Sequence, residues 1–168
     1  MTAPYLVTSY PVAAGKLPGT EEWAKQAAKH SNGALWNNGT WVHRDIRGKP
    51  GKVSNHARGV ALDLSYRYYP AQNKGVSGGR QKSLQFMRRA LANWQDLGIA
   101  LAIDYWPEPF GRSWKCDRQS WRKALRPTFS GAPGSDWWHV EITPEMANSP
   151  AKVKQAFANV FEVSTTTV

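Results

Sequence analysis

The chain has 168 residues, 41% of them hydrophobic, which suits one folded domain with its own core. Its 22 Lys and Arg against 12 Asp and Glu give a net charge of +10, so an anionic partner is expected: nucleic acid, an anionic membrane or a bacterial cell wall. The single cysteine, Cys116, excludes a disulfide within the chain, and no apolar stretch reaches the length of a membrane-spanning helix.

The first third of the chain contains one helical pattern and one short strand pattern. Pro, Gly and small residues over 1–19 predict an extended N-terminal arm. Thr20 as N-cap, with acidic residues directly after it, predicts a helix over 21–31. Residues 40–46 have the composition of a strand, and the Gly and Pro residues of 47–55 predict a loop.

The middle of the chain has the clearest periodic patterns. Alternating and β-branched residues predict a strand over 59–69, and apolar residues at helical spacing predict a helix over 80–98. Residues 99–106 read as a buried strand. The segment 107–135 is a basic, aromatic insertion, within which 118–125 is expected to form a short helix.

The C-terminal third begins with a strand over 136–143, and Thr143 followed by proline predicts a short helical turn. Ser149 as N-cap with Pro150 at the first position predicts a final helix, and 164–168 is expected to be a loose tail. The order of elements predicts a single α+β domain spanning the chain, with a small central antiparallel sheet and flanking helices.

Two strand patterns place polar side chains on one face only. In "SNHARGVALDL", residues 54–64, the apolar residues at 60, 62 and 64 share one face, and Asp63 lies on the other. His56 precedes the turn into this strand, where it can reach the same face as Asp63. In "DWWHVEIT", His139 and Glu141 likewise share the face opposite three apolar residues. If both strands belong to one sheet, these polar groups converge.

Two histidines and one carboxylate suit a catalytic zinc site. Three protein ligands, His56, Asp63 and His139, hold the metal, and the fourth position stays open for water. Asp136, three residues before His139, is then placed to act as general base and to return the proton to the leaving amine. Each of these residue types taken alone more often has a structural role, so the prediction depends on their joint placement.

A cation is also needed to stabilise the oxyanion of a tetrahedral intermediate. Arg44 is the first choice, because it precedes the loop that leads to the first histidine, and Arg47 and Arg58 are nearby alternatives. Glu141 either orients a metal ligand or forms an ordinary ion pair.

Three stretches resemble a family of zinc peptidases that includes D-alanyl-D-alanine carboxypeptidases and the L-alanyl-D-glutamate endopeptidases of phage endolysins. "SNHARGVALDL" matches the family's Ser-x-His-x-x-Gly-x-Ala-x-Asp motif. "DWWHVE" resembles its closing motif, in which an acidic residue stands three positions before the second histidine. "HRDIRGKPGKVSNH" resembles the lead-in to the first motif. The aromatic "SYRYYP" and the segment 107–135 depart from the family pattern.

This resemblance implies zinc ligands at His56, Asp63 and His139, a base at Asp136 and an oxyanion-stabilising cation at Arg44. It also implies the fold of the hedgehog and D-Ala-D-Ala peptidases.

Three further residues are expected beside the ligands, as substrate contacts or as supports for the ligands. They are Ser54, Glu141 and Trp138. The nine tryptophans are expected to line, in part, the substrate groove.

The expected function is therefore a zinc-dependent endopeptidase that cuts stem peptides of bacterial peptidoglycan at an L-Ala-D-Glu or D-Ala-diaminopimelate bond. The start "MTAPYLVTSYPVAAG" lacks the basic and long apolar regions of a secretory signal. A monomeric phage endolysin is expected, made in the host cytoplasm, released to the wall and held there by anionic polymers.

Two alternatives share the motifs: a D-alanyl-D-alanine carboxypeptidase, and a non-catalytic zinc-bearing module that resembles the hedgehog signalling domain. A nucleic-acid binder is disfavoured, because the sequence has no recognised nucleic-acid motif.

Overall fold

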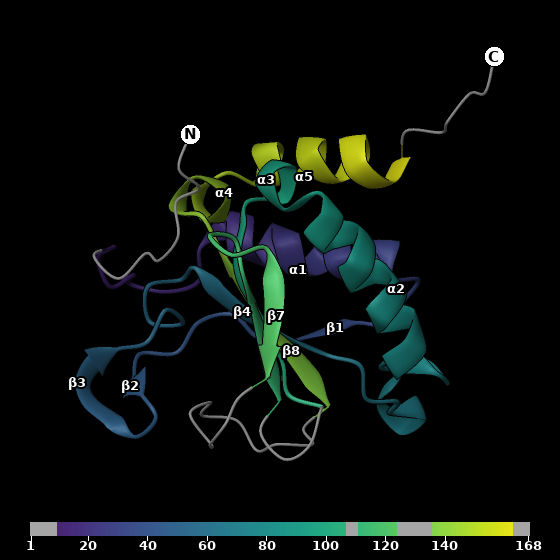
Figure 1. Ribbon diagram of the computed structural model, residues 1–168, viewed down its shortest axis with the longest axis horizontal. Coiled ribbons are helices and arrows are strands. Elements are labelled where there is room, and N and C mark those ends of the chain that lie inside the picture. The colour runs from purple at the N-terminus through teal and green to yellow at the C-terminus, as the bar shows by residue number, and fades with distance from the viewer. Residues whose placement is uncertain (1–9, 107–110, 124–135, 163–168) are drawn as a thin grey trace.

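Figure 1 presents a computed structural model of the chain, in which helices cover one side of a β-sheet. The structure describes residues 10–106, 111–123 and 136–162. Residues 1–9 of the expected arm and the expected tail, 164–168, lie outside the described residues.

Six strands form one antiparallel sheet with the order β1-β4-β8-β5-β6-β7. The strands are β1 (Trp36–Gly39), β4 (Ala61–Ser65), β5 (Ile99–Asp104), β6 (Arg112–Lys115), β7 (Ser120–Lys123) and β8 (Trp137–Ile142). A separate hairpin pairs β2 (Asp45–Ile46) with β3 (Lys49–Val53). The two stretches that carry the predicted site, β4 and β8, are hydrogen-bonded neighbours.

The helices α1, α2 and α5 lie on one side of the sheet, and the β2–β3 hairpin projects away from them (Figure 1). The helices are α1 (Pro18–His30), α2 (Gly79–Ala92), α3 (Trp94–Leu97), α4 (Pro144–Asn148) and α5 (Pro150–Phe157), the last continued by a π-helical turn, Ala158–Glu162. Trp23 and Phe157 meet edge to face in the core, with ring centroids 5.0 Å apart. This arrangement confirms the α+β class and the antiparallel sheet with flanking helices.

None of the helices in the described ranges combines the length and the apolar character needed to cross a membrane. The longest of them, α2, has 14 residues and carries several charged side chains.

The two faces of the central strands differ in the way the alternation predicts. Side chains that point toward the helices are fully buried: Val60 just before β4, Leu62, Leu64, Trp138, Val140 and Ile142. Asp63 and His139 lie between them in sequence and therefore on the opposite face. The helices thus bury one face, and the other face is left for the polar groups.

The predictions for the middle of the chain are confirmed in part: of the strand expected over 59–69, only Ala61–Ser65 is a strand of the sheet. The predicted helix over 80–98 is divided at Asn93 into α2 and α3, and the wholly buried β5 follows it. Thr143 and Ser149 accept hydrogen bonds from the backbone N–H groups of Met146 and Lys152, so both act as the predicted N-caps.

The helix near the N-terminus begins earlier than expected. It starts at Pro18, and Leu17 occupies the N-cap position without a side-chain hydrogen bond. The Thr20 hydroxyl instead donates to the carbonyl of Gly59, so it ties α1 to the turn before β4. Its predicted capping role is wrong because this tertiary contact replaces the local one.

The sequence prediction is also wrong over 40–55. Only Asp45–Ile46 of the expected strand over 40–46 is a strand, and the expected loop contains β3, Lys49–Val53. The turn is closed locally, since the Asp45 carboxylate accepts the N–H of Gly51 at 2.9 Å. Gly and Pro in this segment therefore belong to a hairpin rather than to an irregular loop.

The segment 107–135 contributes two strands to the main sheet. Residues 118–125 were expected to be helical, but Ser120–Lys123 forms β7 and pairs with β6. Arg112 of β6 lies 4.3 Å from the ring centroid of Trp121, a cation–π contact that helps to hold β7 in place. Cross-strand contacts therefore override the local helical preference.

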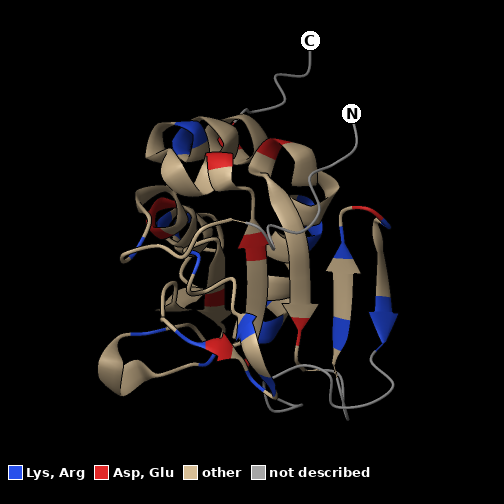
Figure 2. Cartoon of the chain, turned by 90° about the vertical axis from the view of Figure 1, so that its left-hand side faces the viewer, with Lys and Arg blue, Asp and Glu red and all other residues tan. Residues whose placement is uncertain are grey.

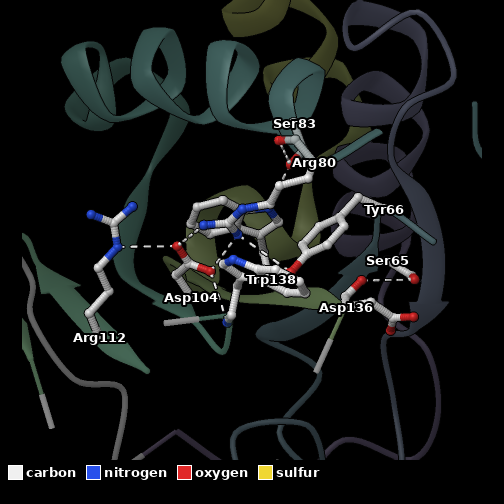
Figure 3. Close-up of polar contacts among 9 residues, drawn as sticks. Ser65, Tyr66, Arg80, Ser83, Asp104, Arg112, Asp136 and Trp138 are labelled. Atoms are coloured by element: carbon white, nitrogen blue, oxygen red, sulfur yellow. Dashed lines mark hydrogen bonds and ion pairs between the residues drawn. The ribbon is translucent and has the colours of Figure 1, made fainter. Parts of the chain in front are cut away.

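A buried ion cluster fixes the end of β5 (Figure 3). Asp104 is fully buried, and its two carboxylate oxygens accept bonds of 2.7 and 2.8 Å from the two Nη atoms of Arg80 in α2. Arg112 of β6 adds a third bond from Nε at 3.1 Å. The Arg80 guanidinium also lies 5.2 Å from the ring centroid of Trp138. The cluster thus joins α2 to β5 and β6.

We expect Asp104→Asn to lower the free energy of unfolding by about 3 kcal/mol, because it leaves the partly buried Arg80 without its counter-charge. Urea denaturation followed by circular dichroism measures the loss. Asp96→Asn, at an exposed position of α3, is the control and should cost less than about 0.5 kcal/mol. Equal losses in the two variants would contradict a stabilising role for the cluster.

Candidate metal centre

Two histidines and one aspartate meet on the face of the sheet opposite the helices. Asp63 of β4 lies directly across from His139 of β8, and His56 lies in the turn before β4. Asp63 Oδ1 is 3.0 Å from His139 Nδ1 and 3.4 Å from His56 Nε2. The ligand atoms of all three residues lie within 4.8 Å of one another, so the group could hold a metal ion. We call this group the His-Asp-His trio.

The turn that carries His56 is built from short local bonds. Ser54 Oγ accepts the backbone N–H of His56 at 3.2 Å, and the N–H of Gly59 donates to the His56 carbonyl at 3.0 Å. Gly59 has a φ of +76°, and a Cβ there would lie 2.6 Å from the Leu17 side chain. The turn therefore requires glycine, and Ser54 helps to hold the backbone of His56.

A second carboxylate fixes the orientation of the His139 ring. Glu141 Oε1 is 3.0 Å from His139 Nε2, and Asn55 donates to Glu141 Oε2 at 2.9 Å. Because Nε2 faces Glu141, Nδ1 of the same ring faces Asp63. Metal-binding histidines commonly donate their second ring N–H to such a carboxylate. The same contact is an ion pair when the ring is protonated, so both roles predicted for Glu141 are consistent with this geometry.

The carboxylates and the His139 ring stabilise each other's charges. Burial alone raises the pKa of Asp63, but hydrogen bonds from His139 and His56 outweigh burial and lower this pKa well below its usual range. Burial alone lowers the pKa of His139, but hydrogen bonds to Asp63 and Glu141 outweigh it and raise that pKa. The two carboxylates thus favour the protonated form of the His139 ring. A metal ion that binds this ring must displace the proton, so metal affinity rises with pH.

The chemistry of the donors agrees with a transition-metal ion. Calcium and magnesium prefer sites made of oxygen atoms alone, whereas two imidazoles and one carboxylate suit zinc and other first-row transition metals. Three protein ligands also leave a coordination position for a substrate or water. The residues present therefore could hold a metal ion of this kind.

The trio lies in a cavity of about 730 Å³, a volume typical of small-ligand sites. Apolar side chains line part of its wall: Leu101, Ile103 and Tyr105 of the β5 segment pack with Trp137 in a small cluster separate from the main core. Other lining residues come from the β2–β3 hairpin and from β6. The cavity is thus enclosed by elements that are far apart in the sequence.

Arg44 lines the cavity, as do Arg47 and Arg58. The Arg44 carbonyl accepts the backbone N–H of Ser54 at 3.1 Å, which links this residue to the turn that carries His56. Its Nη1 donates to the Asp45 carbonyl at 3.2 Å. The predicted cation is therefore within the cavity, together with the two arginines that the sequence offered as alternatives.

Asp136 is not among the residues that line the cavity. Its carboxylate forms an ion pair with Arg67, and its backbone carbonyl accepts the Tyr66 N–H at 2.9 Å. The same carbonyl accepts a bond from Ser65 Oγ at 3.0 Å (Figure 3). The residue that the motif offers as general base is thus held at the end of the sheet, outside the cavity.

Trp138 belongs to the core and not to the metal centre. It is fully buried on the helix side of the sheet, where its Nε1 donates to Ser83 Oγ at 3.1 Å (Figure 3). His139, the next residue, points to the opposite face. The expectation that Trp138 contacts a substrate or supports a ligand is therefore wrong, and Trp137 is the tryptophan that lines the cavity.

Several cavity residues were not predicted from the sequence. They are Asn55, Tyr105, Lys49, Lys52 and Lys115. Asn55 lies inside the first motif, but nothing local indicates its bond to Glu141, 86 positions away. The lysines of the hairpin were visible as a basic stretch, "RGKPGK", whose position beside the trio depends on the fold.

No protein-family model, curated protein or solved structure matches the chain. The donor set of the trio and the cavity around it are therefore the observations on which a proposal of function rests.

We expect His139→Ala to abolish metal retention, because it removes one of three ligands and the partner of Asp63. Atomic absorption after loading with zinc and dialysis should give about one zinc per chain before the substitution and almost none after it. The control is His43→Ala, an exposed histidine that does not line the cavity, which should retain zinc. A His139→Ala protein that still holds one zinc per chain would remove this residue from the site.

Proposed function

We propose that the protein is a zinc-dependent peptidase that hydrolyses peptide bonds in the stem peptides of bacterial peptidoglycan. The observation that carries the proposal is the His-Asp-His trio, which lies in a cavity also lined by cationic and apolar side chains. The motifs around His56 and His139 support the choice of a peptidase, because they resemble those of peptidoglycan-cleaving zinc enzymes.

His56, Asp63 and His139 would hold the zinc ion, which supplies a Lewis acid that polarises a carbonyl group. Neighbouring residues would support these ligands. Glu141 holds the His139 ring with Nδ1 toward Asp63, and Asn55 in turn holds Glu141. This arrangement keeps the donor atoms in place before any ion arrives.

Peptide hydrolysis needs a group that takes a proton from the attacking water and returns it to the leaving nitrogen. Asp136 is our proposed base, on its spacing from His139. To serve in this way its carboxylate must leave Arg67 and turn toward the cavity. Glu141 is the alternative, because its carboxylate already lines the cavity.

Negative charge that develops on the carbonyl oxygen needs a cation beside it. Arg44 is our proposed group for this purpose, and its place on the cavity wall supports the assignment. The hydrogen bond from the Ser54 N–H to the Arg44 carbonyl ties the backbone of Arg44 to the turn that carries His56.

The proposal extends to a role as a phage endolysin that acts on the wall at lysis. The resemblance to endolysin peptidases and the net charge of +10 support this extension, since bacterial walls carry carboxylates and phosphate polymers. A D-alanyl-D-alanine carboxypeptidase would release single D-alanine residues, whereas the proposed endopeptidase cuts inside the stem.

Digestion of diaminopimelate-type peptidoglycan by the zinc-loaded protein tests the function. We expect new free amino groups and soluble fragments, loss of both on treatment with a chelator, and their return when zinc is added back. Mass spectrometry of the fragments identifies the bond. Digestion that persists without metal would overturn the zinc mechanism, and the absence of any digestion would favour a non-catalytic module.

Substitution of the two candidate bases separates their roles. We expect Asp136→Asn to keep zinc and to reduce kcat by at least about a hundredfold, in the range typical of a general base. Glu141→Gln should weaken zinc binding about tenfold or more, because it removes the charge that supports His139. Zinc titration and kcat are measured on both variants. A normal kcat in Asp136→Asn would show that Asp136 is not the general base and would leave Glu141 as the candidate.

A further inference from the structure

The cavity walls carry far more positive than negative charge. Six lining residues are Lys or Arg: Arg44, Arg47, Lys49, Lys52, Arg58 and Lys115. Two lining residues are carboxylates, Asp63 and Glu141, and both are engaged by histidine rings of the trio. The basic residues that line the cavity therefore outnumber its acidic residues.

The β2–β3 hairpin is the main source of this charge. Lys49 and Lys52 of β3 are exposed and line the cavity, and neither ammonium group has an ion-pair or hydrogen-bond partner within the described residues. The acid of the hairpin, Asp45, accepts the N–H of Gly51 within the turn. The two ammonium groups are thus available to an anionic ligand.

A second wall faces the cavity from the main sheet. Lys115 of β6 lines it, next to the apolar strip formed by Leu101 and Ile103. Figure 2 shows basic residues on the β6 and β7 strands at this edge of the sheet. A ligand in the cavity therefore meets positive charge from the hairpin and from β6, and apolar surface between them.

We propose that this cavity selects acidic peptides, and that Lys49 and Lys52, which both line it, bind free carboxylates of the substrate. The inference rests on the proposed peptidase function and names its substrate class: stem peptides whose side carboxylates are free, in preference to those in which the carboxylates are amidated. A carboxylate near an ammonium group gains Coulomb energy, and an amide at the same place does not.

The shape of the charged surface favours a peptide over an extended polyanion. The cations converge on one concave site of about 730 Å³ that also contains the trio and an apolar wall. A site of this size encloses a few residues of a peptide. Binding of a nucleic acid or wall polymer instead uses a basic stripe along the backbone.

The test compares two substrates and two double variants. The substrates are the tetrapeptide L-Ala-γ-D-Glu-diaminopimelate-D-Ala and the same peptide with its two side carboxylates amidated. Lys49→Gln/Lys52→Gln removes the two hairpin charges at exposed positions, and Lys25→Gln/Lys154→Gln removes the same charge from exposed positions of α1 and α5. All are studied as the zinc-loaded full chain.

We expect the unsubstituted protein to cleave the acidic peptide with a kcat/KM at least about fivefold above that for the amidated one. The hairpin variant should lose about fivefold on the acidic peptide, chiefly through KM, and little on the amidated one. The control variant should match the unsubstituted protein. The difference should shrink as salt is raised, because salt screens exposed charges.

Equal kcat/KM for both peptides in the unsubstituted protein would overturn the inference and leave the peptidase function in place. If neither peptide is cleaved, digestion of peptidoglycan decides whether the peptidase proposal fails or the bond lies outside the tetrapeptide, and calorimetric binding of the same two peptides decides the inference by itself. Tighter binding of the acidic peptide that the hairpin variant loses supports it, and equal binding overturns it. Displacement of the acidic peptide by duplex DNA at low concentration would assign the cavity to a polyanion.

Discussion

The in-register pairing of β4 with β8 is the constraint on which the rest of the molecule depends. It sets Asp63 opposite His139 and, by the same alternation, Leu62 opposite Val140 on the other face. A slip of one residue would carry the apolar side chains out of the core and the polar ones into it. Because the core residues are fully buried, the energy that holds this register is the burial of the helix-facing side. The geometry of the trio is therefore maintained by packing that lies behind it.

The two faces of the sheet have different tasks for this reason. The helix side is filled by large apolar side chains such as Trp23 and Trp138, and the Asp104 cluster links β5 and β6 to α2. The open side keeps a cavity whose polar groups are partly withdrawn from water, where charge interactions are stronger than in bulk solvent. This explains how the neighbouring carboxylates raise the pKa of His139 although burial opposes the shift.

The β2–β3 hairpin brings basic side chains to the cavity, although its strands are not part of the main sheet. Its partner strands pair only with each other, and it reaches the trio through the turn that begins at Ser54. The net charge of +10 is thus not spread evenly, since the cavity gathers six cationic side chains. A general affinity for anionic surfaces and a local preference for an acidic ligand are consistent with the same set of charges.

The sequence by itself determined the elements whose signals are local. Alternation over 59–64 and 137–142 identified the faces of β4 and β8, and the caps at Thr143 and Ser149 located the last helices. It also offered the trio as a candidate set, because residues on one face of a strand follow from a period of two.

Only the tertiary structure decided which strands are neighbours and what surrounds the trio. The pairing of β6 with β7, the bond from Asn55 to Glu141 and the ion pair of Asp136 with Arg67 join residues whose local sequence does not encode the contact. Long-range contacts of this kind depend on how the whole chain packs, so a local pattern can suggest a functional group but cannot fix the wall, the charge or the depth of the cavity that it occupies.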